Sequence, residues 1–369
     1  TLDDSIENVA VGFRAGYNIT TSDKNVLIGM QAGQLMTTGN QNTYVGWDSG
    51  RYQVGGSNNT AVGNGAGKYQ RGSNNVMMGV SAQFGESSSP YTNGSNNTAI
   101  GTSALANTRA SQSYTTALGS EAGYATTGSY NTFVGGKAGY GGTTSAPFSS
   151  GINNTAVGYQ ALDAFTTGYE NVAIGSGAGT NLSTGYTSTF VGHSAGASVT
   201  TAGNNTFIGY AAGLGTTGTG NAVLGNHAMK AGAGDAAYNT AVGGGSLYAI
   251  TSGDKNTAIG SDAGQALTTT DNTVLIGYYA GYAINSTDAA GTVAIGYQAG
   301  LNVTDGRYNT AVGYNAMYVN SGSDKNTALG YAALTNMNGT DGDTLNTAVG
   351  YYAGGGAMTS VENTIMGAL

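Results

Sequence analysis

The sequence predicts an all-β protein, a repetitive parallel β-solenoid or β-roll with rungs of about 17 residues. The first observation is composition: 65 of the 369 residues are glycine and only 8% are charged, whereas about a quarter of an ordinary domain is charged. The second is a short motif that recurs along the whole chain. The third is that each position of the aligned motifs keeps one chemistry. Such a chain fills a thin core many times over instead of one thick core.

The repeat unit is Asn-Thr-Ala-Val-Gly, then two variable residues, then Ala-Gly or Ala-Leu. Clear copies run from Asn59 to Gly63, from Asn154 to Gly158, from Asn256 to Gly260 and from Asn309 to Gly313. The glycine that ends each motif marks 21 copies, and 11 of the 20 spacings between these marker glycines are 17 residues. The repeat leaves no part of the chain outside it. We therefore expect residues 1–369 to be one continuous array and a segment of a longer fibre protein.

The first two motif positions are typical of a turn that enters a strand. Asn fills the first position in 17 of 21 copies. It is a common turn residue, and amides stacked from rung to rung are able to form a hydrogen-bonded ladder. The second position is Thr or Val in all copies but one, which favours a β-strand.

The third and fourth motif positions are apolar in every copy. Successive strand residues point to opposite faces, so two adjacent apolar positions predict a strand that is buried on both faces. One face packs inside the rung. The other packs most economically against further copies of the chain, which also protects the strand edges. The pattern therefore predicts a homotrimeric fibre, with the chains intertwined or side by side.

The residues after the marker glycine predict a tight turn. The third residue after it is Ala in 18 of 20 copies, and the fourth is Gly in 13 and Leu or Met in six. Small residues are typical of places where two backbones approach closely. A polar linker then leads to the next Asn, and glycine at this frequency excludes a helix.

The Asn-Thr-Ala-Val-Gly-Tyr-x-Ala-Leu pattern, with Thr-Thr-Gly linkers such as Thr126–Gly128, resembles the repeats of phage tail-fibre proteins. Those repeats often precede an intramolecular chaperone of the endosialidase type. The pattern is also similar to the head repeats of trimeric autotransporter adhesins, whose shorter units form a left-handed parallel β-roll in a trimer. The resemblance covers the whole chain and implies a trimeric β-roll. A chaperone or a membrane anchor in the flanking sequence would separate the two possible owners.

Charge and composition exclude several classes of function. The net charge of −8 and the pI near 4.5 do not fit a nucleic-acid partner, which favours a basic stripe. An apolar run of about 18 residues, as a membrane helix requires, is absent, so we expect no membrane insertion in this segment. The chain has no cysteine and therefore no disulfide framework. Together with the resemblance, this predicts a location on the virion surface or on the bacterial cell surface.

Residues that carry chemistry are few and scattered. His193 and His227 follow different marker glycines two rungs apart, which does not favour a shared metal or a base–nucleophile pair. Asp341 and Asp343 share one linker, where a single calcium or sodium ion is the alternative to solvated charge. We expect no catalytic residue, no metal site and no cofactor.

Tyrosine is abundant in the position directly after the marker glycine, with seven copies there and with Phe13 and Trp47 in the same column. Packing between rungs or across a trimer seam is the favoured interpretation. An exposed aromatic stripe that stacks on sugars is the alternative.

The two longest spacings, 22 and 23 residues, contain both prolines of the chain, Pro90 and Pro147, which precede Tyr91 and Phe148. Insertions into repeats often form the binding edge. We therefore predict Pro90, Tyr91, Pro147 and Phe148 as receptor contacts.

The sequence thus predicts a structural, non-enzymatic fibre or adhesin shaft, foremost a phage tail fibre, that displays or contributes to a receptor-binding surface. Its partners would be itself, as a homotrimer, and a cell-surface polysaccharide. The closest alternative is a bacterial trimeric adhesin or extracellular appendage. A polysaccharide depolymerase and an ice-binding protein with stacked Thr columns are more distant alternatives.

Overall fold

The computed structural model describes residues 7–85, 93–107, 112–142, 149–232, 234–337 and 342–368. The predicted fold class is confirmed: the chain is an all-β parallel β-solenoid of about 20 turns with rungs of ~17 residues. Among the described residues, the only helical segment is the 3₁₀ turn η1, Thr287–Ala289. The chain divides into two compact units, Thr1–Thr187 and Ser188–Leu369.

In the first unit, each motif forms one three-residue strand, and consecutive strands pair in parallel. Equivalent motif positions lie opposite one another; Ala156, for example, pairs with Ala173. The strands are β1 (Val9–Val11), β2 (Val26–Ile28), β3 (Thr43–Val45), β4 (Thr60–Val62), β5 (Val76–Met78), β6 (Thr98–Ile100), β7 (Thr116–Leu118), β8 (Thr132–Val134), β9 (Thr155–Val157) and β10 (Val172–Ile174).

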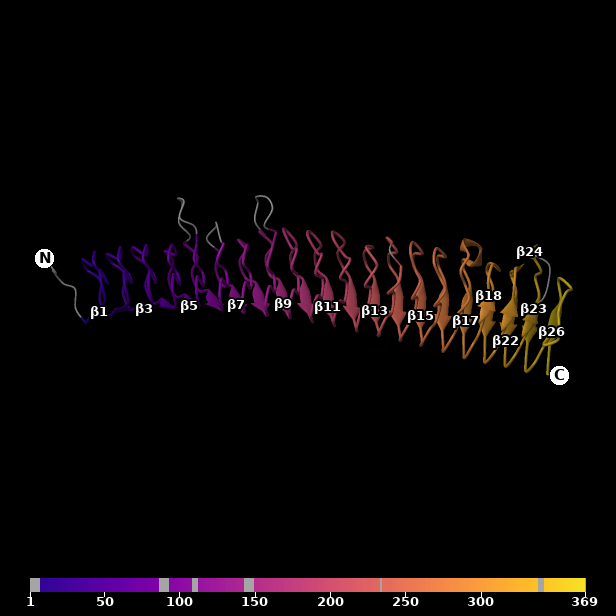
Figure 1. Cartoon of the computed structure of the whole chain (residues 1–369). Helices are drawn as coiled ribbons and strands as arrows, with labels where there is room; N and C mark the ends of the chain where they lie inside the picture. The colour runs from indigo at the N-terminus through magenta and orange to yellow at the C-terminus, as the bar shows by residue number, and fades with distance from the viewer. Residues whose placement is uncertain are drawn as a thin grey trace. The chain divides into compact units, whose positions relative to one another are not determined.

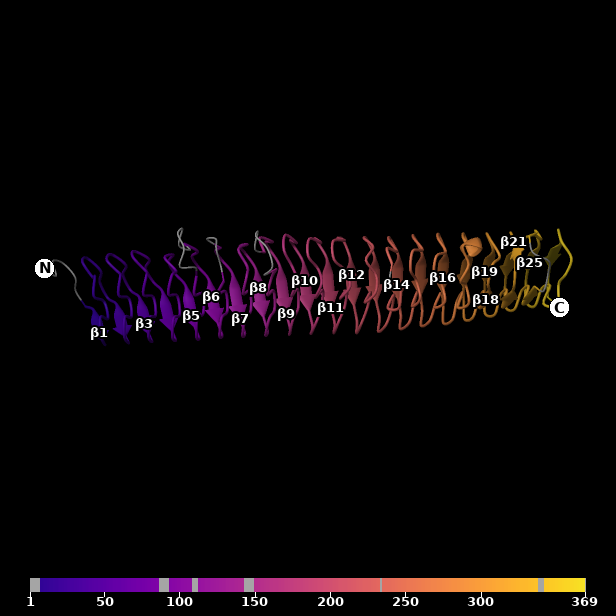
Figure 2. The ribbon, with the colours of Figure 1, turned by 45° about the horizontal axis from the view of Figure 1, so that its top comes forward.

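The second unit repeats this arrangement and adds short strands in its turns and linkers. The motif strands are β11 (Thr189–Val191), β12 (Thr206–Ile208), β13 (Ala222–Leu224), β14 (Thr240–Val242), β15 (Thr257–Ile259), β16 (Val274–Ile276), β17 (Val293–Ile295), β19 (Thr310–Val312), β22 (Thr327–Leu329), β25 (Thr347–Val349) and β26 (Thr364–Met366). The added strands are β18 (Asn302–Val303), β20 (Val319–Asn320), β21 (Ser323–Asp324), β23 (Asn336–Met337) and β24 (Gly342–Asp343); β18, β20 and β23 form one small sheet, and β21 and β24 another. Within each unit, the motif strands lie side by side in sequence order (Figures 1 and 2).

The two apolar motif positions have different environments in the single chain. We call the third motif position the strand-core position and the fourth the outer position. The strand-core side chains point into the rung; Leu27, Phe133 and Leu275 are all 0% exposed. The outer side chains are half-buried or exposed in every rung. The single chain therefore buries only one face of each strand. The further copies of the chain that we predict to cover the other face are not present in the single chain.

The close approach of backbones occurs at the marker glycines. Gly158 has φ +131°, and a Cβ on it would lie 2.6 Å from the carbonyl oxygen of Gly175 in the next rung. A side chain is excluded there because both the backbone conformation and the neighbouring carbonyl reject it. The same contact recurs from rung to rung within each unit, which explains why the marker glycine is invariant.

The fourth residue after the marker, which we call the turn-core position, follows a different rule. The prediction that close backbone approach demands a small residue here is wrong. Gly281 has φ +60°, and a Cβ on it would lie 2.6 Å from the Leu275 side chain of its own rung. Leu334 occupies the equivalent position with φ +46° and is 0% exposed. Side-chain volume inside the rung, together with the left-handed conformation, therefore governs this position.

Large side chains at the strand-core and turn-core positions replace one another. Where the turn-core residue is Leu or Met, the strand-core residue of that rung is small. The six pairs are Ala99 with Leu105, Ala156 with Leu162, Val223 with Met229, Ala241 with Leu247, Ala311 with Met317 and Ala328 with Leu334. Where the strand-core residue is Leu, Tyr or Phe, the turn-core residue is Gly. Seven rungs combine Ala with Gly, but no rung has a large apolar side chain at both positions. The two positions therefore compete for the same space inside the rung.

The predicted amide ladder is present. Asn154 is 1% exposed, and its backbone N–H and Nδ2 both donate to Oδ1 of Asn131, at 2.8 and 3.2 Å. Its Nδ2 also donates to the carbonyl oxygen of Gly168 at 2.9 Å. In turn, its Oδ1 accepts from the backbone N–H and Nδ2 of Asn171, both at 3.1 Å. Each amide therefore satisfies buried groups in its own rung and in both neighbours.

Candidate functional site

The predicted receptor contacts lie outside the described part of the chain. Pro90 and Tyr91 fall within residues 86–92, and Pro147 and Phe148 within residues 143–148. Asp341, one of the two candidate ion ligands, is also outside it. These assignments stay predictions, so the candidate surfaces below come from the rungs themselves.

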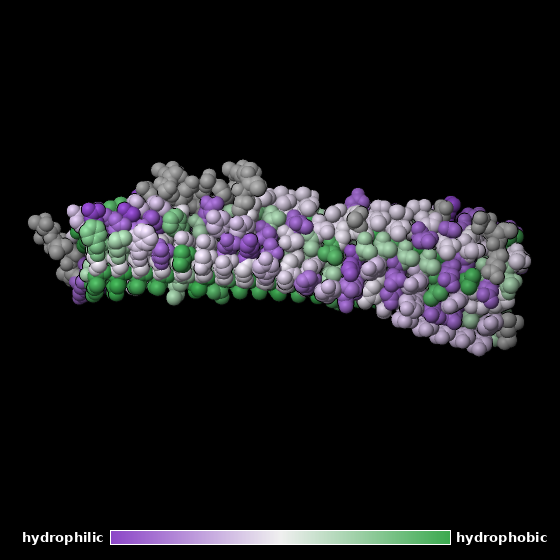
Figure 3. Space-filling model, in the orientation of Figure 1, coloured by the Kyte–Doolittle hydropathy of each residue, from purple (hydrophilic) through white to green (hydrophobic). Residues whose placement is uncertain are grey.

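The most extended candidate surface is the outer face of the motif strands. Outer-position side chains with notable exposure include Val11 at 57%, Leu118 at 45% and Leu224 at 49%. Because the strands pair in register, these side chains form a continuous apolar column within each unit. Figure 3 shows a row of hydrophobic side chains along the lower edge of the first unit. Exposed apolar surface of this regularity is typical of a contact with another surface.

The tyrosine column after the marker glycine forms a stacked ladder in the second unit. The tyrosine ladder consists of Tyr278, Tyr297, Tyr314, Tyr331 and Tyr351, whose successive ring centroids are 5.5, 4.8, 5.2 and 5.0 Å apart, with interplanar angles of 16°, 10°, 5° and 9°. Its rings are 41–58% exposed. Because neighbouring rings cover the faces, the inner rings present edges and hydroxyls to solvent. This arrangement supports the packing interpretation over sugar stacking for this column.

The two histidines meet the same aromatic ring. The ring of His193 stacks on the ring of Tyr210, with centroids 5.4 Å apart. The ring of His227 meets the same tyrosine edge-to-face, with centroids 5.2 Å apart. The tyrosine between them, which sequence reasoning did not connect to either, keeps the two imidazoles apart. No cluster of three or more His, Cys, Asp or Glu residues suited to a metal occurs among the described residues.

A buried ionic cluster in the first unit was not predicted. Asp48 is 4% exposed and pairs with Lys68 at 2.7 Å and with Arg51 at 3.3 Å. Arg51 also lies over the ring of Tyr52, 5.0 Å from its centroid, and Lys68 lies over the ring of Tyr69, 5.5 Å from its centroid. These two rings stack on each other. Because the carboxylate is buried and doubly paired, this cluster is best explained as packing within the turn segment.

Asp163 carries a buried carboxylate oxygen, Oδ1, with no hydrogen-bond partner among the described residues. Burial raises the pKa of this carboxyl above its ordinary value; Lys137 opposes the shift and Glu121 adds to it. The folded chain thus holds the proton more tightly than the unfolded chain does. The contribution of Asp163 to stability is therefore greatest at low pH and is lost as pH rises through the folded-state pKa.

We expect Asp163→Asn to raise the urea midpoint of unfolding at neutral pH, because the amide removes the charge that burial disfavours. The advantage over the wild type should shrink as pH falls below the folded-state pKa, where Asp163 is already neutral. Urea titrations of both proteins between acidic and neutral pH measure this. An advantage of Asp163→Asn that is the same at every pH would contradict the assignment.

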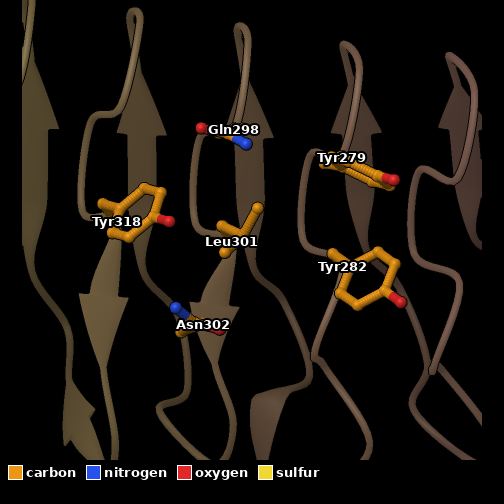
Figure 4. A pocket seen from close by; sticks show the side chains of 6 residues that line it. All are labelled: Tyr279, Tyr282, Gln298, Leu301, Asn302 and Tyr318. Carbon is orange, nitrogen blue, oxygen red and sulfur yellow. The ribbon is translucent and has the colours of Figure 1, made fainter.

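A shallow hollow of about 290 Å³ lies on the turn side of the second unit. It is lined by Tyr279, Tyr282, Gln298, Leu301, Asn302 and Tyr318 (Figure 4). Tyr282, Leu301 and Tyr318 are each the fifth residue after a marker glycine, in three consecutive rungs. Sequence reasoning missed this column because it is chemically variable. The sequence pattern that could have indicated the hollow is two aromatic residues in this column, separated by one rung with a non-aromatic residue.

No protein-family model matches the chain, and no curated protein matches it at a significant level. In the part of the chain that the structure describes, no helix is long and apolar enough to cross a membrane.

Proposed function

We propose that this protein is a structural segment of a homotrimeric fibre, foremost a phage tail fibre, that displays or contributes to a receptor-binding surface for cell-surface glycans. The observation that carries the proposal is the outer column. Each rung exposes one Val, Ile, Leu or Met at the same motif position, from Val11 in the first rung to Met366 in the last. Because each rung buries only one face of its strand, the outer side chains form an apolar surface along the repeat, and a partner would bury it.

The partner proposed for this surface is a second and a third copy of the chain. Outer side chains recur at the spacing of paired strands, about 4.8 Å. A partner contacts every outer side chain along many rungs only if its own side chains recur at the same spacing. Another copy of this chain has that spacing. Three copies around one axis would bury their outer columns together and leave the turn segments facing solvent. Loops and turns on that outer side would then contact a glycan many times, so that weak contacts add up to avidity.

Light scattering coupled to size-exclusion chromatography tests the assembly. We expect the wild type to elute with three times the chain mass. The double variant Ile28→Lys/Leu118→Lys should elute as a smaller species, because it places two charges in the apolar column; the two side chains are 39% and 45% exposed in the single chain, so the rung itself tolerates them. Circular dichroism checks that the variant keeps its β-structure.

The matched control is Gln41→Lys. The residue before each motif Asn is already Lys in three rungs, at Lys24, Lys255 and Lys325, and Gln41 adopts the same left-handed conformation, with φ +58°. This variant adds a charge away from the outer column and should stay trimeric. A folded, monomeric wild type would refute the proposed assembly.

A further inference from the structure

The hollow at Tyr282, Leu301 and Tyr318 arises from an interrupted aromatic column. Tyr282 follows β16, Leu301 follows β17 and Tyr318 follows β19, so the two tyrosines lie two rungs apart, or about 10 Å. Leu301 between them is too short to continue a stack. In Figure 4, the rings of Tyr282 and Tyr318 turn their faces to the viewer, with Leu301 and Asn302 between them. Unlike the inner rings of the tyrosine ladder, they do not stack on each other.

A third ring holds the platform of Tyr282 in place. Tyr279 lies 4.9 Å from Tyr282 with an interplanar angle of 79°, and Figure 4 shows its ring edge-on. The hydrogen bond with Tyr278 raises the pKa of the Tyr279 hydroxyl to about 12.

Two amides supply the polar chemistry of the hollow. The side chains of Gln298 and Asn302 are half-buried and make no hydrogen bond within the described part of the chain. Each offers an N–H₂ donor and a carbonyl acceptor in one plane. None of the six lining residues is charged. An uncharged ligand with both apolar and hydroxyl-rich surfaces therefore fits better than an anion or a cation.

The same construction recurs in the first unit. Phe84, Ala106 and Tyr124 are again the fifth residues after consecutive marker glycines, with a small residue between two aromatic ones. They line a hollow of about 320 Å³ together with Ser81, Gly85, Ser103 and Asn107. Aromatic rings two rungs apart, a non-aromatic floor and an amide beside it thus occur twice.

We propose that the hollow of Tyr282, Leu301 and Tyr318 binds a neutral oligosaccharide, with the two rings as stacking platforms and Gln298 and Asn302 as hydrogen-bond partners for sugar hydroxyls. A pyranose ring has an apolar C–H face and a polar rim, which matches an aromatic face flanked by amides. A planar aromatic ligand would occupy one ring only, whereas an oligosaccharide spans both. This inference rests on the glycan-contact part of the proposed function and assigns it to a specific site.

Saturation-transfer NMR and calorimetry with cello-, chito- and β-galacto-oligosaccharides test the site, with a galacturonide oligomer as the acidic comparison. We expect at least one neutral oligosaccharide to bind more tightly than its monosaccharide, and the galacturonide to bind more weakly. Tyr282→Leu and Tyr318→Leu should each weaken binding by about five- to tenfold, because each removes one stacking platform.

Two further variants separate this site from general effects. Leu301→Tyr restores a continuous column and should abolish binding although it adds an aromatic ring. Tyr314→Leu removes a ring of the tyrosine ladder, whose faces are covered by its neighbours, and should leave affinity unchanged.

Absence of binding by every neutral oligosaccharide of the panel would overturn the inference, as would equal affinity of the wild type and Leu301→Tyr. Light scattering on the same samples keeps the two proposals apart. A trimer that binds no sugar refutes only this site, whereas a folded monomer refutes the proposed assembly whatever it binds.

Discussion

Transferring a leucine from the strand-core position to the turn-core position of one rung should restore most of the stability that either single substitution removes. Leu275→Ala is expected to lower the free energy of unfolding of the second unit by about 3 kcal/mol, because the fully buried side chain leaves a cavity. Gly281→Leu should cost about as much, because its Cβ meets Leu275 at 2.6 Å and its φ of +60° is left-handed. The double variant Leu275→Ala/Gly281→Leu should recover most of the loss.

The reason is the exchange that the rungs already display. Ala328 with Leu334 and Ala311 with Met317 are native examples of the arrangement that the double variant creates. Leu334 is fully buried with φ +46°, so a large side chain is accommodated at the turn-core position when the strand-core residue is Ala. The remaining cost should be the left-handed conformation of a non-glycine residue, about 1 kcal/mol.

Urea unfolding of the wild type, both single variants and the double variant measures the coupling as a double-mutant cycle. A coupling energy of about 3 kcal/mol or more is expected. Additive losses in the double variant would show that the two positions do not share one volume, and the exchange rule would then be wrong.

Asn154→Ala should lower the free energy of unfolding of the first unit by about 3 kcal/mol, since it removes one step of the amide ladder. Without the amide, the backbone N–H of Asn171 and the carbonyl oxygen of Gly168 lose their partners in a buried environment. Oδ1 of Asn131 also loses the Nδ2 donor from Asn154. Each buried group left unsatisfied costs about 1–3 kcal/mol. Denaturant unfolding followed by circular dichroism gives the value.

Asn154→Ser is the matched control, because one rung of the chain already uses serine in this column. The hydroxyl of Ser188 accepts from the backbone N–H of Asn205 at 3.2 Å. The serine variant should therefore keep an acceptor for Asn171 and lose less than half as much stability as the alanine variant. Equal losses would mean that the hydrogen bonds of the ladder contribute little and that only the packing of the side chain matters.

The sequence was sufficient to predict the strand and its register. A motif of fixed length places equivalent residues opposite one another, so the pairing of Ala156 with Ala173 follows from the repeat. The amide column was predictable for the same reason, because Asn154 and Asn171 are neighbours in any in-register stack. The sequence did not reveal that the glycine at positions such as Gly281 compensates for Leu275, since this depends on which side chains meet inside one rung.

The candidate site was less predictable than the fold. The tyrosine column drew attention first because it is the more regular one. Whether an aromatic ring offers its face or its edge depends on its neighbours in space. Tyr297 is covered on both faces by rings 5.5 and 4.8 Å away, whereas Tyr318 has Leu301 in the neighbouring rung on one side. The interrupted column therefore leaves ring faces uncovered, which is why we propose it as the binding surface.

The sequence by itself determined that this protein is a stack of short parallel strands, because a period of about 17 residues with a fixed chemistry at each position leaves only one way to pair them. It also indicated two apolar strand positions. The tertiary structure decided that the strand-core residue lies inside the rung and the outer residue faces away. The direction of each side chain depends on where the chain turns back, and the turn closes over only one face of the strand.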